Sequence, residues 1–311
     1  MSRLVAAGRL EERVPPHVAL VVAILAVSTS AVLVEWSRAP SLVKALYRVV
    51  FTTAFLLPVA LYRPTDRAAF TEIRPRDLAV AVASGVALAI HFASWFESLR
   101  WTSVAASVTL VQAQPLFVAA GAWAWLDERV TRRTAAGIAV AVVGMLVMSG
   151  GDLLAGAALT GKRPLYGNAL AVLGAVTAAG YVLAGRSLRQ RLPLLPYVTV
   201  VYVTCAAALL AATLTRGYPL FAYPPREWLL FLAMAAGPGL FGHTVLNWVL
   251  AHVESSVVSV SLLGEPVGST LLAALLLAEY PTPVTLLGGA VVLLGVWLTA
   301  SARRSADASA E

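Results

Sequence analysis

The chain alternates long apolar runs with short polar segments. Each run is rich in Ala, Leu and Val and lasts about 20 residues, the length of α-helix that crosses the hydrocarbon core of a bilayer. No run shows the apolar–polar alternation of a membrane β-strand. The pattern therefore predicts an all-α polytopic membrane protein with ten transmembrane helices. The predicted spans are 18–36, 42–62, 78–99, 103–126, 134–150, 165–185, 194–214, 227–250, 255–278 and 284–302.

Composition supports this class. Of the 311 residues, 59% are hydrophobic and 13% are charged, whereas soluble domains carry about 25% charged residues. Turn-forming residues fill the connections, including RPTDRAAFTEIRPRD, which is predicted to be a loop. The single cysteine, Cys205, excludes an internal disulfide and a Cys-based metal cluster, and we expect no metal and no cofactor. The first apolar run is predicted to be a retained helix rather than a signal peptide.

The distribution of Lys and Arg predicts the orientation of the chain. If the N-terminus is inside, inner segments hold 15 of these residues and outer loops hold six. This bias follows the positive-inside rule and predicts a multi-pass protein of the plasma (inner) membrane with both termini cytoplasmic. Orientation in a membrane therefore explains the net charge of +7 better than binding to nucleic acid does.

An internal repeat is found when the sequence is compared with itself at an offset of 151 residues. Between 115 and 144, ten of thirty positions are identical to their partners, and a composition this skewed gives roughly one match in ten by chance. Each copy holds five spans, an odd number, so the copies are expected to face opposite sides of the membrane. We predict repeats at 1–151 and 165–302, joined by a linker at 152–164 and followed by a cytoplasmic tail at 303–311.

Inverted repeats are typical of secondary transporters, whose two halves enclose a site near the midplane and expose it alternately. The segment HFASWFESLRWTSVAASVTLVQAQPLFVAAGAWAWLDERVTRRTAAGIAVAVVGMLVM resembles the EamA module of the drug/metabolite transporter superfamily. The shared features are a proline midway through the fourth helix, a Leu-(Gly/Asp)-Glu ending and a glycine-spaced fifth helix. The second copy, with GEPV and LAEYPTPVTLLGGAVVLLGVWL, resembles the module as well. Asp127 stands where the family more often has glycine.

The same resemblance extends to LYRVVFTTAFLLP, which is similar to the family's second helix, including its arginine at Arg48. It implies that the first four helices of each copy surround a central cavity and that the fifth helix is peripheral.

Glu265 is the first candidate for a substrate-binding side chain. A carboxylate near mid-membrane is costly unless it faces protein or water, and Pro266 beside it leaves a backbone carbonyl free. Glu265 is predicted to bind a cationic substrate group or a coupling proton; the alternative is a buried acid that serves packing. Gln114, next to Pro115, holds the equivalent place in the other copy. Gln112 is expected to lie roughly 200° away around the helix and to be less central.

Two polar pairs share helix faces at helical spacing. His91, a candidate proton relay, lies on one face of the third span with Trp95. His243 and Asn247 form an i, i+4 pair in the eighth span, after a Gly-Pro-Gly at 237–239 that predicts a kink. All four are predicted to line the cavity, and structural hydrogen bonding or packing is the alternative for each.

The remaining candidates have weaker signals. Ser30 and Tyr181, which lie 151 residues apart, are further predicted cavity residues. Arg48 is expected to pair with Glu35, as a structural pair rather than an outer gate. Structural roles are predicted for two prolines and for four glycines whose spacing of seven favours close helix approach. These residues are Pro115, Pro266, Gly137, Gly144, Gly288 and Gly295.

Together these features favour a secondary transporter that moves small metabolites by alternating access. The resemblance points to amino acids or related polar metabolites, often exported. Because no cluster of Arg or Lys is expected at the midplane, phosphorylated substrates are disfavoured and zwitterions or amines are favoured. Proton coupling through Glu265 or His91 and facilitated exchange both stay open.

Other classes of function have less support. An intramembrane enzyme is the first alternative, but H-E-x-x-H, G-x-S-x-G and a P-loop are absent. A channel would need a continuous polar pore, which the scattered polar residues do not suggest. The expected partners are a small-molecule metabolite and the lipid bilayer, with no nucleic acid.

Overall fold

The structure is a computed structural model that describes residues 15–126, 131–154, 161–189, 191–245, 262 and 264–307. Within these residues it contains helices and no strand. The first copy holds α2 (Pro16–Trp36), α3 (Ser41–Tyr62), α4 (Pro64–Glu72), α5 (Pro75–Ser98), α6 (Val104–Val111), α7 (Gln114–Leu126) and α8 (Arg132–Leu154). The second holds α9 (Pro164–Arg189), α10 (Leu194–Thr215), α11 (Pro225–Met234), the π-helical η1 (Ala235–Thr244), α14 (Gly264–Leu277) and α15 (Pro283–Asp307).

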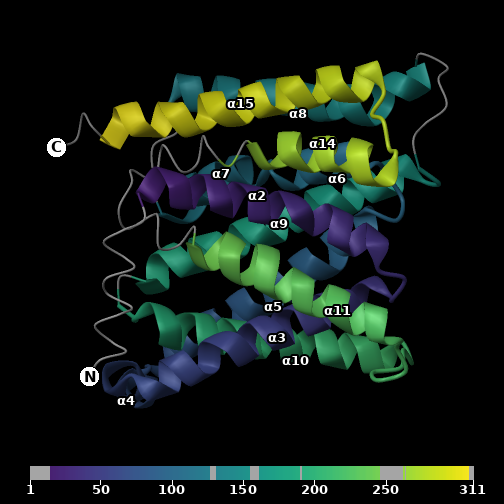
Figure 1. The fold of residues 1–311 in the computed structure, drawn as a ribbon. Coiled ribbons are helices and arrows are strands. Elements are labelled where there is room, and N and C mark those ends of the chain that lie inside the picture. Colours follow the sequence, from purple (N-terminus) through teal and green to yellow (C-terminus); the bar gives the residue numbers. More distant parts are fainter. Residues whose placement is uncertain are drawn as a thin grey trace.

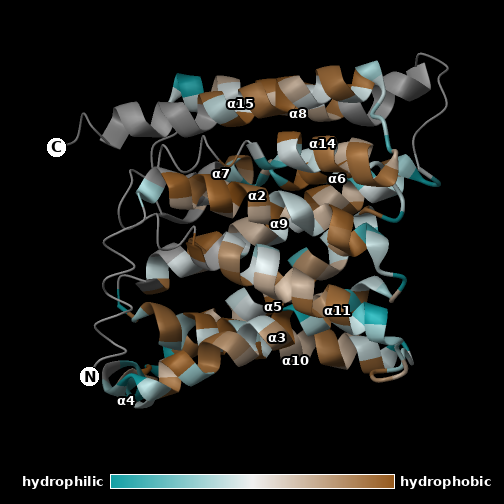
Figure 2. Cartoon of the chain, in the orientation of Figure 1, coloured by the Kyte–Doolittle hydropathy of each residue, from teal (hydrophilic) through white to brown (hydrophobic). Residues whose placement is uncertain are grey.

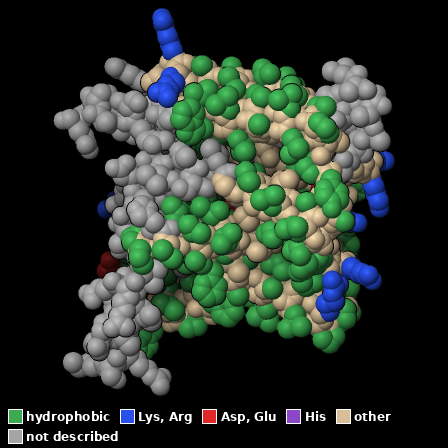
Figure 3. Space-filling model, turned by 45° about the horizontal axis from the view of Figure 1, so that its top comes forward, with side chains coloured by type: hydrophobic (Ala, Val, Ile, Leu, Met, Phe, Trp, Pro, Cys, Tyr) green, Lys and Arg blue, Asp and Glu red, His purple; other side chains and the backbone are tan. Residues whose placement is uncertain are grey.

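The helices form a bundle whose long axes run in similar directions (Figure 1). Among the described residues, α2, α3, α5, α9 and α10 are long and apolar enough to cross a membrane on length and composition alone. Apolar residues occupy the middle of the helices and polar residues gather at their ends (Figure 2). Hydrophobic side chains also cover the outer face drawn in Figure 3, with Lys and Arg at its margins. The predicted all-α polytopic membrane fold is thus confirmed.

The fourth predicted span is broken in its middle. We expected one helix over 103–126, but α6 ends at Val111 and α7 begins at Gln114. Pro115 explains the break, because it has no N–H to donate to the carbonyl of Val111 and its ring crowds that carbonyl. Gln112 and Ala113 form the short turn between the two helices. The prediction of an uninterrupted helix was therefore wrong.

The second copy has a matching irregularity. Leu262 lies in a turn, and α14 begins at Gly264, which is the position 151 residues after Ala113. The N–H of Glu265 donates to the carbonyl of Leu262 at 3.0 Å. Pro266 lies in the first turn of α14, where its missing N–H leaves no intrahelical bond unmade. The starts of α7 and α14 therefore lie within one residue of each other in the repeat.

Two further local features bear on the predictions. The segment expected to be a loop between the second and third spans contains α4, which begins at Pro64 and carries Asp66 in its first turn. Proline at the first position and an acid near the N-terminus both favour a helix, so the loop prediction was wrong there. A kink or local unwinding was the expectation at Gly-Pro-Gly, and the structure has the π-helical η1 there, with Pro238 inside it.

The fifth helices of the two copies, α8 and α15, pair at one edge of the bundle, drawn at the top of Figure 1. Their backbones come very close at the spaced glycines. A Cβ added to Gly144 would lie 2.5 Å from the backbone nitrogen of Val292, and one added to Gly295 would clash with the nitrogen of Ala141. The carbonyls of Gly137 and Gly288 complete these two contacts.

Candidate functional site

A cavity of about 280 Å³ lies inside the bundle. We call it the central cavity. Residues from α2, α3, α5, α9, α10, η1 and α14 line it, together with Gln112 and Gln114 at the break between α6 and α7. None of the described lining residues comes from α8 or α15. This is the arrangement that the family resemblance implied. Its polar lining residues are Arg48, Thr52, His91, Gln112, Gln114, Tyr181, Tyr202 and Glu265.

Arg48 of α3 places a cation in this cavity. Its side chain is only 2% exposed, and its Nη1 donates to the Oγ of Ser30 at 2.9 Å. The guanidinium lies 4.7 Å from the ring centroid of Phe92 and 5.6 Å from that of Phe96. Cation–π contacts and the hydrogen bond fix the head group while leaving other N–H donors for a ligand. Ser30 thus helps to hold Arg48 in place, and its binding of substrate stays a prediction.

Glu265 of α14 places an anion in the same cavity. Its Oε2 accepts a hydrogen bond of 2.9 Å from the Nε2 of Gln112. The same amide nitrogen lies 3.4 Å from the carbonyl oxygen of Leu262. Gln112 is therefore a central residue, contrary to the prediction from helical angles. Those angles assume an unbroken helix, and the chain leaves helical geometry at Gln112.

The two charges act on each other across the cavity. Arg48 and Glu265 interact electrostatically, although no ion pair joins them among the described residues. The expected pairing of Arg48 with Glu35 is not found. The cations that act on Glu35 are Lys44 and Arg100, nearer the ends of the helices. Arg48 is the one Lys or Arg among the described lining residues, so the cavity holds no cluster of these cations.

His91 of α5 lines the cavity with a defined tautomer. Its Nδ1 lies 2.9 Å from the carbonyl oxygen of Gly174. Because a carbonyl only accepts, Nδ1 carries the proton, and in the neutral ring Nε2 is an acceptor. The ring stacks on Trp95 with centroids 5.9 Å apart. Trp95 is itself absent from the cavity lining and lies beside Arg48, and its indole N–H has no partner among the described residues.

The other predicted residues divide into two groups. Gln114 and Tyr181 line the central cavity. The side chain of His243 and the whole of Asn247 lie outside the described residues. Sequence reasoning missed Thr52 and Tyr202, both of which line the cavity.

Only a hydroxyl inside an apolar run marked these two residues in the sequence, a signal that many buried Thr and Tyr share. The Thr52 hydroxyl also donates to the carbonyl of Arg48 at 2.7 Å, which braces the helix that carries the cation.

The residues that follow α14 carry the Glu of the repeat, and their backbone conformation positions its side chain. Ala278 has φ of 55°, a left-handed conformation that an L-residue adopts at a steric cost. This turns the chain so that the Oε1 of Glu279 accepts from the N–H of Val104, at the start of α6, at 2.6 Å. Burial raises the pKa of Glu279, and the hydrogen bond from Val104 opposes that shift. Ala278 is the repeat partner of Asp127, where the family often has glycine.

Two inverted repeats around a central cavity that holds one cation and one anion define a membrane transporter of the two-repeat class. The model of the EamA-like transporter family matches residues 15–150 and 165–301, and the chain belongs to this family. No group of three or more His, Cys, Asp or Glu side chains suited to a metal ion occurs in the described ranges.

A curated relative and a solved structure are similar to the chain. An uncharacterized transporter from Archaeoglobus fulgidus is 29% identical over 214 residues, covering 65% of this chain and 69% of its own length. A crystal structure of a protein with 22% identity covers 93% of this chain and 98% of its own, with a TM-score of 0.62. The latter likeness concerns the fold alone.

Proposed function

We propose that this transporter moves small zwitterionic metabolites, amino acids or closely related amines, across the plasma membrane by alternating access. The observation that carries the proposal is the placement of Arg48 and Glu265 on one cavity. A zwitterion offers each of them a partner: its carboxylate binds the guanidinium, and its ammonium binds the carboxylate.

The size and lining of the cavity support the same substrate class. Its volume of about 280 Å³ lies just below the roughly 300–1,000 Å³ range of pockets for drug-sized ligands. Leu88, Phe92 and Val182 supply apolar surface beside the two charges. A small amino acid has this combination of one carboxylate, one ammonium and a short side chain.

The balance of charge argues against strongly anionic substrates. A phosphorylated metabolite carries about two negative charges and favours several fixed cations. The described lining offers only Arg48, and Glu265 cancels its charge. The cavity is therefore close to neutral overall, which suits a molecule that is itself neutral but polar at both ends.

The matching starts of α7 and α14 beside the site support alternating access. In transporters with inverted repeats, each half moves as a body while the site stays between them. We place both termini in the cytoplasm from the bias in Lys and Arg, and we propose export as the direction that the family resemblance favours. Glu265 is the proposed site of any coupled proton.

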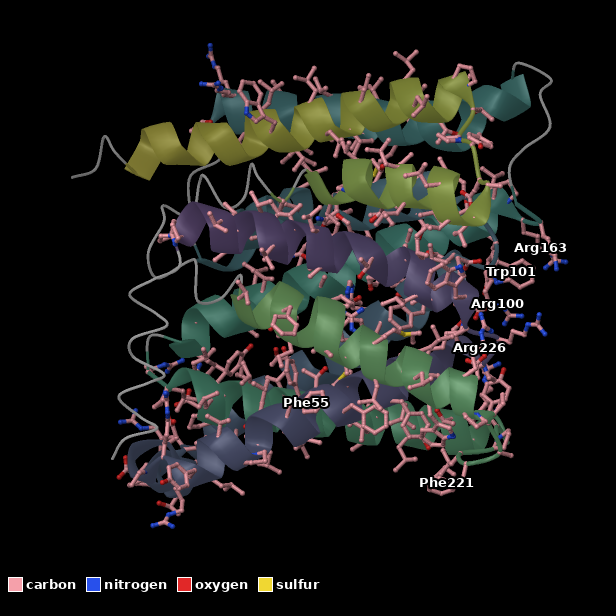
Figure 4. The ribbon with its side chains drawn as sticks, in the orientation of Figure 1. Phe55, Arg100, Trp101, Arg163, Phe221 and Arg226 are labelled. Atoms are coloured by element: carbon pink, nitrogen blue, oxygen red, sulfur yellow. The ribbon has the colours of Figure 1, made fainter. Side chains whose placement is uncertain are left out.

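The test is transport by purified protein in proteoliposomes. We expect saturable uptake or exchange of members of a labelled amino-acid mixture, and little movement of sugar phosphates. Glu265→Gln and Arg48→Met should each abolish that transport, whereas Phe221→Ala, at a side chain that is 77% exposed and labelled in Figure 4, should leave it unchanged. Movement of sugar phosphates in preference to amino acids, or full activity in both cavity variants, would overturn the proposal. Imposed proton gradients of either sign test coupling in the same vesicles.

A further inference from the structure

A second hollow of about 640 Å³ lies where α2 ends and α3 begins. We call it the basic hollow. Its charged and phenolic lining comes from Glu35, Arg38, Lys44, Arg100, Lys162 and Tyr218. Arg100, Arg163 and Arg226 project from this same end of the bundle (Figure 4). The hollow is thus separate from the central cavity, with which it shares no lining residue.

The positive charge of the basic hollow is unusual for the side of the protein that the sequence assigns to the outer loops. Four cations and one carboxylate line the basic hollow. Three of the cations come from loops, and the sequence places only six Lys or Arg residues in the loops of this side. The positive-inside bias explains why such residues are few here, but it does not explain why half of them converge on one hollow.

Internal partners account for only part of this charge. Arg100 lies 3.5 Å from Glu97 and remains half-exposed. The described residues form no ion pair with the side chains of Arg38 or Lys162. A concave, positively charged surface of this kind concentrates anions from solution.

Lys44 gives the hollow a built, buried donor. Its side chain is 3% exposed, and its Nζ donates to the carbonyl of Val34 at 2.8 Å. An ammonium has three donors, so two are left for a ligand. Burying a lysine is unfavourable unless its charge is compensated. Glu35, Glu227 and Glu97 all act electrostatically on Lys44, but only Glu35 lines the hollow, and Arg100 acts on Glu35 as well.

Lys44 of the basic hollow also lies close in sequence to the cation of the central cavity. It precedes Arg48 by four residues on α3, so the two side chains lie on one face of the helix and about 6 Å apart along its axis. Lys44 borders the basic hollow and Arg48 borders the central cavity. The two spaces therefore each have one cation of α3 in their lining, about one helical turn apart.

We propose that the basic hollow is a second binding site, an anion subsite that holds the carboxylate of the transported molecule at the mouth before or after Arg48 binds it. The identity of that molecule rests on the proposed function. The presence of an anion site in the hollow is independent of the proposed function, because anion binding there can be measured without transport.

The first experiment measures the electrostatic potential in the basic hollow by thiol modification. A single cysteine is placed at Tyr218, which lines the hollow, in a Cys205→Ser background. Its matched control is a single cysteine at Phe221, three residues away on the same loop and outside the hollow. Membrane-impermeant methanethiosulfonates, one anionic and one cationic, are applied to each protein in phosphatidylcholine vesicles.

We expect the ratio of anionic to cationic labelling rates to be about ten-fold higher at the Tyr218→Cys site than at the Phe221→Cys site. Adding Lys44→Met and Lys162→Gln should bring the two ratios together, and millimolar succinate should slow labelling only in the hollow. Equal ratios at the two sites, or a high ratio that these substitutions leave unchanged, would overturn the proposal.

Anionic lipid is the other possible source of the bound group. Adding phosphatidylglycerol to the vesicles should affect the two cysteines alike if the hollow takes a free small anion. Selective protection of the Tyr218→Cys site by this lipid, without protection by succinate, would assign the hollow to a headgroup and overturn a substrate subsite.

Transport then separates this proposal from the proposed function. Lys44→Met should raise KM about ten-fold for a carboxylate-bearing substrate with little change in kcat, while Arg48→Met abolishes transport. Preferential anionic labelling in the hollow without transport of any amino acid would refute the proposed function alone. Amino-acid transport together with equal labelling ratios at the two cysteines, and with an unchanged KM in Lys44→Met, would refute the anion subsite alone.

Discussion

The amide nitrogen of Gln112 lies 2.9 Å from the carboxylate of Glu265 and donates to it. The two residues come from opposite repeats: Gln112 lies between α6 and α7, and Glu265 lies in the first turn of α14. The bond therefore joins the two halves of the protein beside the central cavity.

The first prediction concerns this bond. Gln112→Leu leaves the buried carboxylate of Glu265 without its donor and should lower the free energy of unfolding by about 1–3 kcal/mol. Glu265→Gln should remove much of that penalty, because a neutral amide is less costly to leave unpaired. Thermal unfolding in detergent of both single variants and the double variant measures the coupling. Additive effects would show that the bond contributes nothing.

A second prediction concerns Ser30, which helps to position Arg48. Ser30→Ala removes a hydrogen bond to a charged group, which is worth about 1.5–3 kcal/mol, and should raise KM by about ten-fold while kcat changes little. Arg48→Lys keeps the charge but loses the planar fork, so it should transport less well than Ser30→Ala. Initial rates in proteoliposomes give both constants. A fall in kcat alone for Ser30→Ala would contradict a positioning role.

The third prediction tests the glycine contact between α8 and α15. A Cβ at Gly144 would lie 2.5 Å from a backbone nitrogen of α15, so Gly144→Ala should force the helices apart and cost about 1–3 kcal/mol. Gly180→Ala is the matched control, since nothing lies within 4 Å of a Cβ there. It should be neutral or stabilising by up to about 1 kcal/mol. Equal melting temperatures for the two variants would refute close packing at Gly144.

The fourth prediction concerns the left-handed residue at the end of α14. Ala278→Gly relieves steric strain at φ 55° and should raise the free energy of unfolding by about 0.5–1 kcal/mol after the greater entropy of an unfolded glycine is subtracted. Ala274→Gly, inside the same helix, should instead lower it by about 1 kcal/mol. Thermal unfolding of the pair checks the sign. Destabilisation by both substitutions would mean that the left-handed conformation is wrong.

The fifth prediction follows from the raised pKa of Glu279. A carboxyl whose pKa is higher in the folded state takes up its proton first in that state, so stability rises as pH falls towards that pKa. Relative to Glu279→Gln, the wild type should gain stability as the pH falls from 7 towards 4.5, the ordinary pKa of a glutamate. Melting temperatures of both proteins across this range measure the difference. A wild type that loses stability relative to the variant on acidification would show that the hydrogen bond from Val104 outweighs burial.

The sequence alone determined the membrane class, the approximate spans and the repeat. Each of these depends on residues that are near one another in the chain or separated by a fixed offset. The apolar runs are set by the thickness of the bilayer, and the odd number of spans in each copy follows from counting them. Glu265 was likewise visible, because a carboxylate beside a proline inside an apolar run has few structural explanations.

The tertiary structure decided which of these residues meet. Gln112 was placed wrongly because angles around a helix hold only while the helix is continuous, and Pro115 ends it. Arg48 was assigned to Glu35 because both were thought to lie near one end of the bundle. The opposed charges of Arg48 and Glu265 come from helices far apart in the chain, and no spacing rule relates them. Only the packing of α3 and α14 around one cavity brings both charges into its lining. Contacts between distant segments depend on how helices pack rather than on their order in the chain.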